Sequence, residues 1–248
     1  MKTPASVLSD NRSFYDQTAA VYDLADGRRS TQLETWLRAK LKALADQHGN
    51  ASFLDLGCGT GFVMKSARSY FKQIIGVDIS SKMLNQAKKY GQVIQADIAQ
   101  LPPQIKNKTF NVIVCFATLH HCFDIQAVLR QAYQVIKKQG CFYSDHDLEA
   151  HFAKNFKLPL SVYRVLRNPA YRYSQLVKGL DKGLYKKTEY HSSGLDALKI
   201  IKQLKNIGFT NIKTTYHWFG LSPFTDIIFK QRQFNLGRAP LLAIKAIK

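Results

Sequence analysis

The sequence predicts an α/β fold in which a doubly wound, mostly parallel sheet of seven strands carries helices on both faces. Three observations support this fold class. Short apolar runs alternate with helix-length segments through residues 50–145. The first run leads directly into a glycine-rich turn. The fourth run is apolar at nearly every position, as is usual for a strand buried on both faces.

Five strands are expected in the central part of the chain. They are residues 52–56, 73–77, 93–96, 111–116 and 140–144. Helical patterns separate them around residues 61–71, from an N-cap at Ser80 through Met83, Leu84 and Ala87, and over residues 124–137. This alternation is typical of βαβ units and therefore of a parallel sheet.

Segments on both sides of this core complete one expected domain of residues 1–248. A helical arm over residues 11–48 precedes the core of residues 50–147, and a small basic cap over residues 150–194 is inserted after the fifth strand. Residues 195–248 are expected to hold a helix ended by Gly208, then strands near 209–218 and 224–230. The tail from Phe234 to Lys248 fits either a last packed strand or helix, or a segment lying on a membrane surface.

Positive charge dominates the composition, and most of its excess lies in the C-terminal part. The 248 residues include 36 Lys and Arg against 17 Asp and Glu, a formal net charge of +19. Residues 151–248 contain 18 of these basic residues and 4 of the acidic ones. Such a field favours an anionic partner, which leaves an acidic small molecule, a membrane surface and nucleic acid open, or it serves solubility alone.

Targeting and redox features indicate a cytoplasmic protein. No run of about 18 apolar residues is present, and the polar N-terminus lacks the apolar core of a signal peptide. None of the four cysteines forms a CxxC pair, and Cys58, Cys115 and Cys141 fall on or beside predicted strands. We therefore expect buried free thiols in the cytoplasm, with peripheral contact to the inner face of a membrane left open.

The glycines after the first strand identify the candidate ligand site. In an open α/β sheet, ligands bind beyond the carboxyl ends of the strands, where the strand order reverses. Gly57, Gly59 and Gly61 permit a tight turn and a close approach of ligand to backbone, and the next helix offers free N–H groups. A dinucleotide fingerprint requires its third glycine at position 62, which is Phe62. The spacing therefore disfavours a nicotinamide dinucleotide.

Four segments resemble the class I, Rossmann-like S-adenosylmethionine-dependent methyltransferases. They read Leu-Asp-Leu-Gly-Cys-Gly-Thr-Gly over residues 54–61, Gly-Val-Asp-Ile-Ser over 76–80, Gln-Ala-Asp-Ile over 95–98 and Phe-Asn-Val-Ile-Val-Cys over 110–115. Residues 14–23 resemble the arm of small-molecule members of that family, including ubiquinone and menaquinone biosynthesis methyltransferases.

This resemblance implies S-adenosylmethionine as the cofactor. Asp55 and the glycine loop would hold its amino-acid end, Asp78 its ribose hydroxyls and Asp97 its adenine amine. A carboxylate at a strand end suits a ribose diol, because charge-assisted hydrogen bonds are strong. The implied cofactor residues are Tyr22, Asp55, Gly57, Cys58, Gly59, Gly61, Asp78, Ile79, Met83, Asp97, Ile98, Phe116 and Ala117. Tyr15 or Tyr22 is expected either to cover the cofactor or to pin the arm to the core.

Three histidines are the candidate catalytic residues. His120 and His121 follow the fourth strand, where the resemblance places the sulfonium and the acceptor, and His146 ends the fifth strand. Because histidine titrates near neutral pH, each is a candidate base; cofactor packing or a structural hydrogen bond is the alternative role. No ligand spacing is diagnostic of a metal, so none is expected. The fourth strand also lacks the Asp/Asn-Pro-Pro-Tyr/Phe stretch of DNA amino methyltransferases.

The expected function is methyl transfer to a small-molecule or lipid-like acceptor, apolar or anionic, with release of S-adenosylhomocysteine. Interleaved tyrosines and arginines over residues 163–173 suit a lid for such an acceptor. Two alternatives stay open. One is a methyltransferase that acts on RNA or protein through the basic C-terminal segment, and the other is a cofactor-binding module without catalytic activity.

Overall fold

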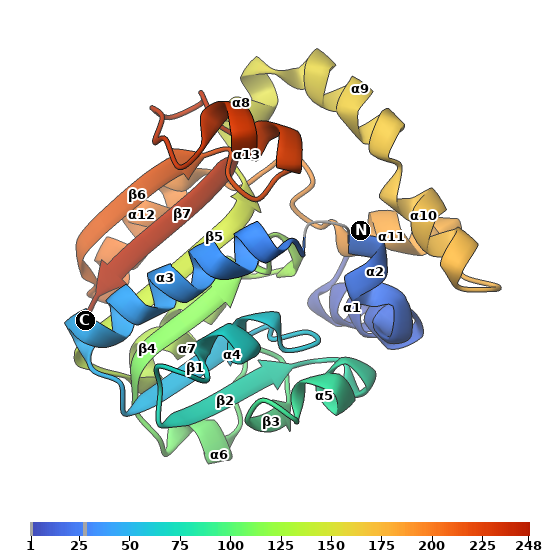
Figure 1. The fold of residues 1–248 in the computed structure, drawn as a ribbon. Coiled ribbons are helices and arrows are strands. Elements are labelled where there is room, and N and C mark those ends of the chain that lie inside the picture. Colours follow the sequence, from blue (N-terminus) through green and yellow to red (C-terminus); the bar gives the residue numbers. More distant parts are fainter. Residues whose placement is uncertain (1, 27–28) are drawn as a thin grey trace.

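One sheet of seven strands organises the chain (Figure 1). The structure is a computed structural model that describes residues 2–26 and 29–248. The strands are β1 (Ser52–Leu56), β2 (Gln73–Asp78), β3 (Gln92–Gln95), β4 (Phe110–Phe116), β5 (Ile136–Leu148), β6 (Thr210–His217) and β7 (Leu241–Ile247). Their order is β3-β2-β1-β4-β5-β7-β6, and β7 runs antiparallel to both of its neighbours. The predicted α/β fold class with a mostly parallel sheet is confirmed.

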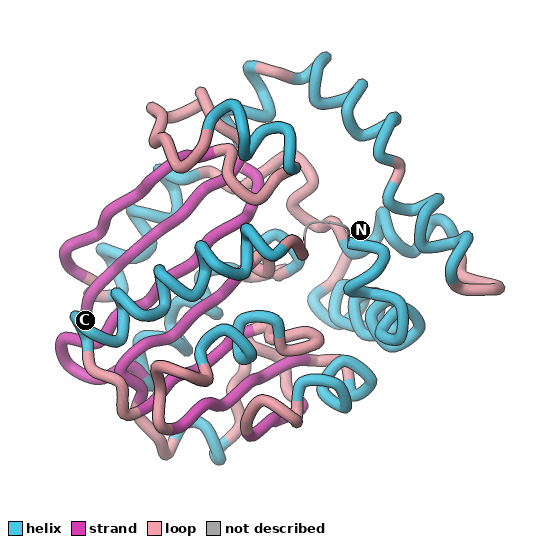
Figure 2. Tube along the Cα trace, in the orientation of Figure 1, coloured by secondary structure: helices cyan, strands magenta, loops and turns pink. Residues whose placement is uncertain are grey.

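Helices cover both faces of the sheet, and each face has its own hydrophobic core (Figure 2). One core includes α6 (Pro103–Lys106), α7 (Ile125–Val135) and α12 (Ala197–Ile207); the other includes α3 (Thr31–His48), α4 (Phe62–Ala67) and α5 (Ser81–Ala87). Successive side chains of a strand point to opposite faces, so a strand between two cores is apolar throughout. All five residues of β1 are buried accordingly.

The sheet contains a topological switch point between β1 and β4. β2 and β3 lie on one side of β1, whereas β4 and β5 lie on its other side. The loops that leave β1 and β4 therefore diverge at the carboxyl ends of the strands, where ligands of open α/β sheets bind. The loop after β4 contains the short helix η2 (Leu119–His121).

The N-terminal arm and the basic cap pack on each other beside this edge (Figure 1). The arm comprises α1 (Pro4–Thr18), η1 (Ala19–Val21) and α2 (Tyr22–Asp26); the cap comprises α8 (Ala150–Asn155), α9 (Lys157–Arg167), α10 (Pro169–Leu176) and α11 (Lys182–Thr188). Phe14 and Ala25 of the arm share an apolar cluster with Tyr173, Leu180 and Leu184 of the cap. The predicted helical arm of residues 11–48 thus divides, because its second half, α3, packs on the sheet.

The predicted strand at residues 224–230 is wrong, since α13 (Pro223–Phe229) occupies this segment. Ser222 caps the helix by accepting the Thr225 N–H, and Pro223 stands in its first turn, two features that favour a helix start. The last strand is β7 in the tail, which lies between β5 and β6. Because six of the seven β7 residues are buried, the tail is part of the core and not a segment on a membrane surface.

Replacing Ile244 in β7 by Ala should destabilise the protein, because this side chain is fully buried in the core. We expect the free energy of unfolding to fall by about 2–5 kcal/mol, the usual cost of the cavity that such a truncation leaves. Urea unfolding followed by circular dichroism measures the change. Leu198→Ala is the matched control, since Leu198 of α12 is 54% exposed and should cost far less. Equal losses in the two variants would contradict the burial of the tail.

Candidate functional site

A cavity of about 370 Å³ lies between the arm and the carboxyl ends of the strands. Its volume is within the range of about 300–1,000 Å³ that is typical of small-molecule sites. Eleven of the thirteen predicted cofactor residues line it: Tyr22, Gly57, Cys58, Gly59, Asp78, Ile79, Met83, Asp97, Ile98, Phe116 and Ala117. The remaining two, Asp55 and Gly61, are not among the lining residues.

Glycine is required at each of the three positions of the loop for a different structural reason. All three have positive φ angles, which favour glycine. A Cβ on Gly57 would lie 2.3 Å from Thr118 Cγ2, so this position keeps the loops after β1 and β4 in contact. A Cβ on Gly61 would lie 3.0 Å from Ala87 Cα of α5. Among the described residues, none places an atom within 4 Å of such a Cβ on Gly59, which leaves open space along the cavity.

Asp78 ends β2, and backbone donors fix its carboxylate. Its Oδ2 accepts the Gly59 N–H at 2.8 Å, and its Oδ1 accepts the Ser80 N–H at 2.9 Å. Burial raises the pKa of Asp78, and these N–H groups oppose that shift because they stabilise the charged form. The carboxylate is therefore oriented toward the cavity by the protein itself.

Asp55 lies deeper than Asp78 and is 1% exposed. Burial and, less strongly, the charge of Asp78 raise the pKa of Asp55 to about 8, while Arg29 opposes the shift. Its buried Oδ2 accepts no hydrogen bond from any residue that the structure describes. A buried carboxyl oxygen without a donor is costly, so this atom is suited to a donor group that enters behind the glycine loop.

Asp97 follows β3, the edge strand, and stands beside an apolar part of the cavity. Its Oδ1 accepts the Ala99 N–H at 2.8 Å. Ile79, Met83 and Ile98 line the cavity with it. Apolar side chains of this kind suit the faces of a flat base, while a carboxylate at the edge can accept from an exocyclic amine.

Hydrogen bonds from the core hold the arm over the cavity. Ser80 Oγ donates to Asp16 at 2.6 Å, Thr60 Oγ1 donates to Asp23 at 2.8 Å, and Gln86 Nε2 donates to Ala19 O at 2.5 Å. Tyr15 and Tyr22 both line the cavity, with ring centroids 5.8 Å apart. Tyr22 also stacks on Tyr173 of the basic cap. The arm therefore closes one side of the cavity and anchors the cap at the same time.

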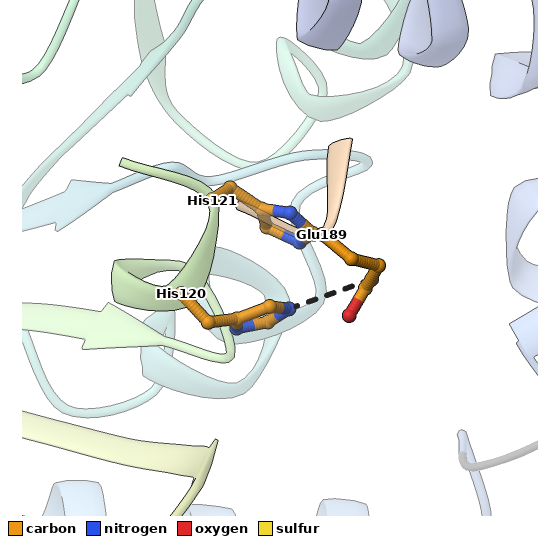
Figure 3. Close-up of side chains that lie close together, drawn as sticks. All are labelled: His120, His121 and Glu189. Carbon is orange, nitrogen blue, oxygen red and sulfur yellow. Dashed lines mark ion pairs between the residues drawn. The ribbon is translucent and has the colours of Figure 1, made fainter. Parts of the chain in front are cut away.

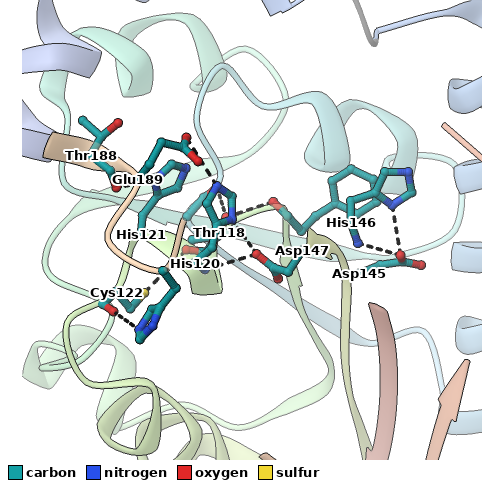
Figure 4. Close-up of polar contacts among 12 residues, drawn as sticks. Thr118, His120, His121, Cys122, Asp145, His146, Asp147, Thr188 and Glu189 are labelled. Carbon is teal, nitrogen blue, oxygen red and sulfur yellow. Dashed lines mark hydrogen bonds and ion pairs between the residues drawn. The ribbon is translucent and has the colours of Figure 1, made fainter. Parts of the chain in front are cut away.

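His121 connects the arm, the loop after β4 and the basic cap (Figure 4). Its Nδ1 lies 2.9 Å from Thr188 O, and its Nε2 lies 2.8 Å from Tyr15 Oη. Because a carbonyl can only accept, Nδ1 carries the proton and Nε2 accepts the Tyr15 hydroxyl. Burial and then the neighbouring His120 lower the pKa of His121 to about 4. His121 is therefore a neutral link with both ring nitrogens engaged.

His120 does not line the cavity and lies instead between two carboxylates, Glu189 (Figure 3) and Asp147 (Figure 4). Its Nδ1 is 2.6 Å from Asp147 Oδ1, and its Nε2 is 3.8 Å from Glu189 Oε1. Burial disfavours the charged ring, but Glu189 and Asp147 outweigh it and raise the pKa of His120 to about 10. At neutral pH the ring is a cation that joins the cap to β5, and a cation cannot accept a proton.

His146 lines the cavity from β5, in a left-handed backbone conformation with φ of 68°. Its ring stacks on Phe116 at a centroid distance of 4.3 Å, and its Nδ1 lies 3.0 Å from Asp145 Oδ1. Asp145 also accepts His217 Nε2 at 2.8 Å and the Tyr143 hydroxyl. Although burial opposes ionisation, His217 and His146 hold the pKa of Asp145 well below its usual range.

Two groups of side chains bring metal-binding atoms within 4.8 Å of one another. They are His120, His121 and Glu189, and Asp145, His146 and His217. In the second group, the hydrogen bonds to Asp145 explain the close approach (Figure 4). In the first group, the contacts of His120 with Asp147 and Glu189 explain it. Both groups are therefore explained by their own hydrogen bonds and ion pairs.

The cavity also contains residues that the sequence analysis missed. The Arg29 guanidinium lies over the rings of Tyr22 and Phe62, at 5.3 and 4.6 Å from their centroids. Arg29 lies in an irregular segment between α2 and α3, where no periodicity or motif marks it. Thr118 was within reach of sequence reasoning, because it directly follows the predicted pair Phe116 and Ala117.

Comparisons with known proteins agree with this arrangement. The methyltransferase domain family matches residues 54–144, which carry the glycine loop, Asp78 and Asp97. This segment of the chain is therefore a methyltransferase domain. Malonyl-[acyl-carrier protein] O-methyltransferase of Yersinia pestis is 30% identical over 131 residues, which are 51% of this chain and 46% of that protein. Ubiquinone biosynthesis O-methyltransferase of Coxiella burnetii is 26% identical over 138 residues, 50% of this chain and 56% of that protein.

The chain thus spans about half the length of the curated relatives it matches. A solved methyltransferase structure from Thermotoga maritima has a TM-score of 0.61 at 15% identity, and the match covers 98% of this chain and 99% of that one. Phosphoethanolamine N-methyltransferase 2 of Haemonchus contortus, solved with S-adenosylmethionine, has a TM-score of 0.62 at 16% identity over 96% and 59% of the two chains. These likenesses concern the fold. The predicted enzyme class and cofactor are confirmed by the family match.

Asp55→Asn should change how the stability of the cofactor-free protein depends on pH. The pKa of Asp55 is about 8 in the folded protein against 3.8 for an ordinary Asp, so the folded state retains a proton that the unfolded state loses. The contribution of Asp55 to stability therefore falls as the pH rises from about 4 to about 8. Since Asn does not titrate, the variant should gain stability relative to the original protein across this range.

Urea unfolding of both proteins at several pH values measures this difference. Asp46→Asn, at an exposed position of α3, is the control and should show no comparable gain. A pH-independent difference between Asp55→Asn and the original protein would show that Asp55 does not titrate in this window.

Proposed function

We propose that this protein transfers the methyl group of S-adenosylmethionine to a small acceptor that is apolar and either neutral or anionic. The observation that carries the proposal is the chemistry of the cavity beside Phe116 and His146. Leu33, Phe62 and Val63 supply apolar surface there, and Arg29 supplies a positive charge. The acidic lining residues lie elsewhere: Asp78 ends β2, and Asp97 and Asp124 follow β3 and η2.

The residues present fit the cofactor at each of its polar groups. The buried, unpartnered Oδ2 of Asp55 suits the ammonium of its amino-acid part, and the open space at Gly59 allows a close approach to the backbone. The oriented carboxylate of Asp78 would accept the ribose hydroxyls. Asp97 would accept the adenine amine between Ile79 and Ile98.

The residues of the chain would contribute mainly alignment and the exclusion of water. When bound, S-adenosylmethionine supplies a methyl group on a sulfonium, whose transfer to a lone pair of the acceptor leaves S-adenosylhomocysteine. Tyr15 and Tyr22 would close the arm side of the cavity, while Phe116 and His146 form a wall of stacked rings. Holding the reacting atoms in line can supply much of the acceleration of such a displacement.

His146 is the strongest of the three predicted bases for an acceptor that must lose a proton. His120 is a cation outside the cavity lining, and both ring nitrogens of His121 are engaged in holding the arm and the cap. His146 lines the cavity, with its Nδ1 against the Asp145 carboxylate and its Nε2 buried beside Gly220, so it would act as a base only when its ring is neutral and the acceptor reaches Nε2. We assign the other two histidines to holding the basic cap in position.

The names of the relatives favour oxygen as the methylated atom. The Yersinia pestis protein is named for O-methylation of a malonyl group on acyl-carrier protein, and the Coxiella burnetii protein for an O-methylation in ubiquinone biosynthesis. Carboxylate and hydroxyl acceptors are also compatible with a positive charge at Arg29, which would repel an amine cation. We carry over the acceptor class alone, because the match covers about half of each relative.

Asp78→Ala should weaken S-adenosylmethionine binding by about a hundredfold or more, since it removes the acceptor of two charge-assisted hydrogen bonds. Isothermal titration calorimetry measures the dissociation constant. Asp78→Asn, which retains the shape but not the charge, should fall between the two proteins. Asp46→Asn serves as a control for charge alone. An unchanged affinity in Asp78→Ala would rule out the proposed ribose site.

Methyl transfer from tritiated S-adenosylmethionine into a cell extract should label the small-molecule and lipid fractions more than RNA or protein. Given the apolar cavity, most label is expected in the organic-solvent extract. His146→Phe keeps an aromatic ring against Phe116 but removes the ring nitrogens, so the labelling rate should fall at least about tenfold with cofactor affinity unchanged. Label confined to RNA or protein would refute the proposed acceptor class, and full activity of His146→Phe would refute the base.

A further inference from the structure

An exposed apolar surface lies on two helices that take no part in the cavity. It consists of Leu158, Val162 and Val165 of α9 and Phe224, Ile227 and Ile228 of α13, which we call the apolar rim. Their side chains are between 48% and 76% exposed. Figure 1 shows α9 and α13 at the same end of the molecule. Exposed apolar side chains are ordinary singly, but six on two neighbouring helices indicate a contact surface.

Helix α9 has an exposed apolar face on one side and a half-buried face on the other. Leu158, Val162 and Val165 follow the spacing i, i+4, i+7, which places them on one side of the helix. Leu160, Tyr163 and Arg167 are half-buried on the other side. Of the α9 residues whose side chains the structure describes, none is fully buried. Packing within this chain therefore does not explain the outer apolar residues.

An aromatic groove connects the two helices of the apolar rim. Phe156, directly before α9, lines this groove together with Trp218, Phe229 of α13 and Arg238. The ring of Trp218 stacks on Phe229 at 4.8 Å, and its Nε1 donates to Arg238 O at 3.3 Å. The groove thus offers an aromatic floor and a cationic side chain between two apolar helices.

Basic side chains flank this surface. Lys157 and Arg164 lie beside the apolar face of α9, and Lys230 and Arg232 follow α13; all four are exposed. They belong to the segment 151–248, which has 18 basic residues and 4 acidic ones. Apolar side chains bordered by Lys and Arg are complementary to the interface of an anionic bilayer, where apolar groups enter the acyl region and cations meet the phosphates.

We propose that the apolar rim docks this protein on the surface of a membrane that contains anionic lipid. The apolar side chains of α9 and α13 enter the interface, and Lys157, Arg164, Lys230 and Arg232 contact the headgroups. The contact is peripheral: none of the described helices has the length and apolarity that a span requires. The sequence analysis considered the tail of residues 234–248 as a membrane-contacting segment, but this tail forms β7. We propose the apolar rim as the contact surface instead.

This docking does not require methyl transfer. It extends the proposed function, because a lipid-like acceptor would be present in the membrane on which the protein docks. The basic cap carries both elements. Thr188 and Glu189 at the end of the cap contact His121 and His120 beside the cavity, while α9 forms half of the apolar rim. Arg164 of α9 also donates a hydrogen bond to Ser192 O, just after Thr188 and Glu189 in the chain, and so links α9 to the part of the cap that contacts the two histidines.

Sedimentation with lipid vesicles tests the proposal without any turnover. The full chain should bind vesicles of phosphatidylcholine mixed with phosphatidylglycerol and bind pure phosphatidylcholine at least about tenfold more weakly, because each basic residue near an anionic surface adds to the attraction. Two double variants, Leu158→Asp with Val165→Asp and Phe224→Asp with Ile227→Asp, should each reduce binding to the mixed vesicles at least about tenfold.

Matched variants on α12 separate the apolar rim from general effects of charge. Leu198→Asp introduces the same charge at another exposed apolar position, and Lys202→Glu with Lys205→Glu removes cations elsewhere; both should bind like the original protein. Lys157→Glu with Arg232→Glu should weaken binding instead. Circular dichroism and cofactor titration verify that every variant is folded.

Three results would overturn the proposal: no binding to the mixed vesicles, equal binding by the variants of the apolar rim and of α12, or retention by RNA in place of vesicles. Each can occur with methyl transfer intact. Conversely, vesicle binding with no transfer to any fraction would refute the proposed function and leave the docking surface standing.

Discussion

The buried carboxylate of Asp78 is the interaction on which the rest of the site depends. Its two oxygens accept N–H groups from Gly59 and Ser80, so one charge fixes the turn after β1 and the start of α5. Ser80 in turn donates to Asp16 of the arm. Removing this carboxylate from water is unfavourable, as the raised pKa of Asp78 records. Backbone donors offset part of that cost, and ligand hydroxyls would offset more.

Two adjacent histidines show how surroundings decide the role of a residue type. The rings of His120 and His121 lie 3.8 Å apart, yet their pKa values move in opposite directions, to about 10 and about 4. Carboxylates of Asp147 and Glu189 surround the first ring, whereas a carbonyl and a phenol hold the second. A protonated His120 disfavours a second positive charge on His121. The two rings together therefore carry a single charge and hold the basic cap through a fixed set of hydrogen bonds.

The sequence was informative where backbone geometry or strong periodicity limits the choice of residue. The glycine turn, the positions of Asp78 and Asp97 after strands and the places of the five central strands along the chain were predictable for this reason. Residues 224–230 were not, since their β-branched and aromatic residues suit a strand while the Ser222-Pro223 start favours a helix. Arg29 and the unequal histidines were not predictable either, because long-range packing of arm, loop and cap determines their environments.

The same distinction explains why the donor site is clearer than the acceptor site. The proposed cofactor residues lie at or just after strand ends, whose positions the sheet fixes. On the proposed acceptor side, the arm and the end of β5 line the cavity, and the basic cap supports them through His121, Tyr15 and the aromatic cluster around Tyr173. A specificity built on such contacts can change by repacking a few side chains without disturbing the sheet. If α9 meets a membrane, the basic cap connects that surface with the loop beside the cavity through Thr188 and Glu189, so docking and methyl transfer share one element while using different side chains.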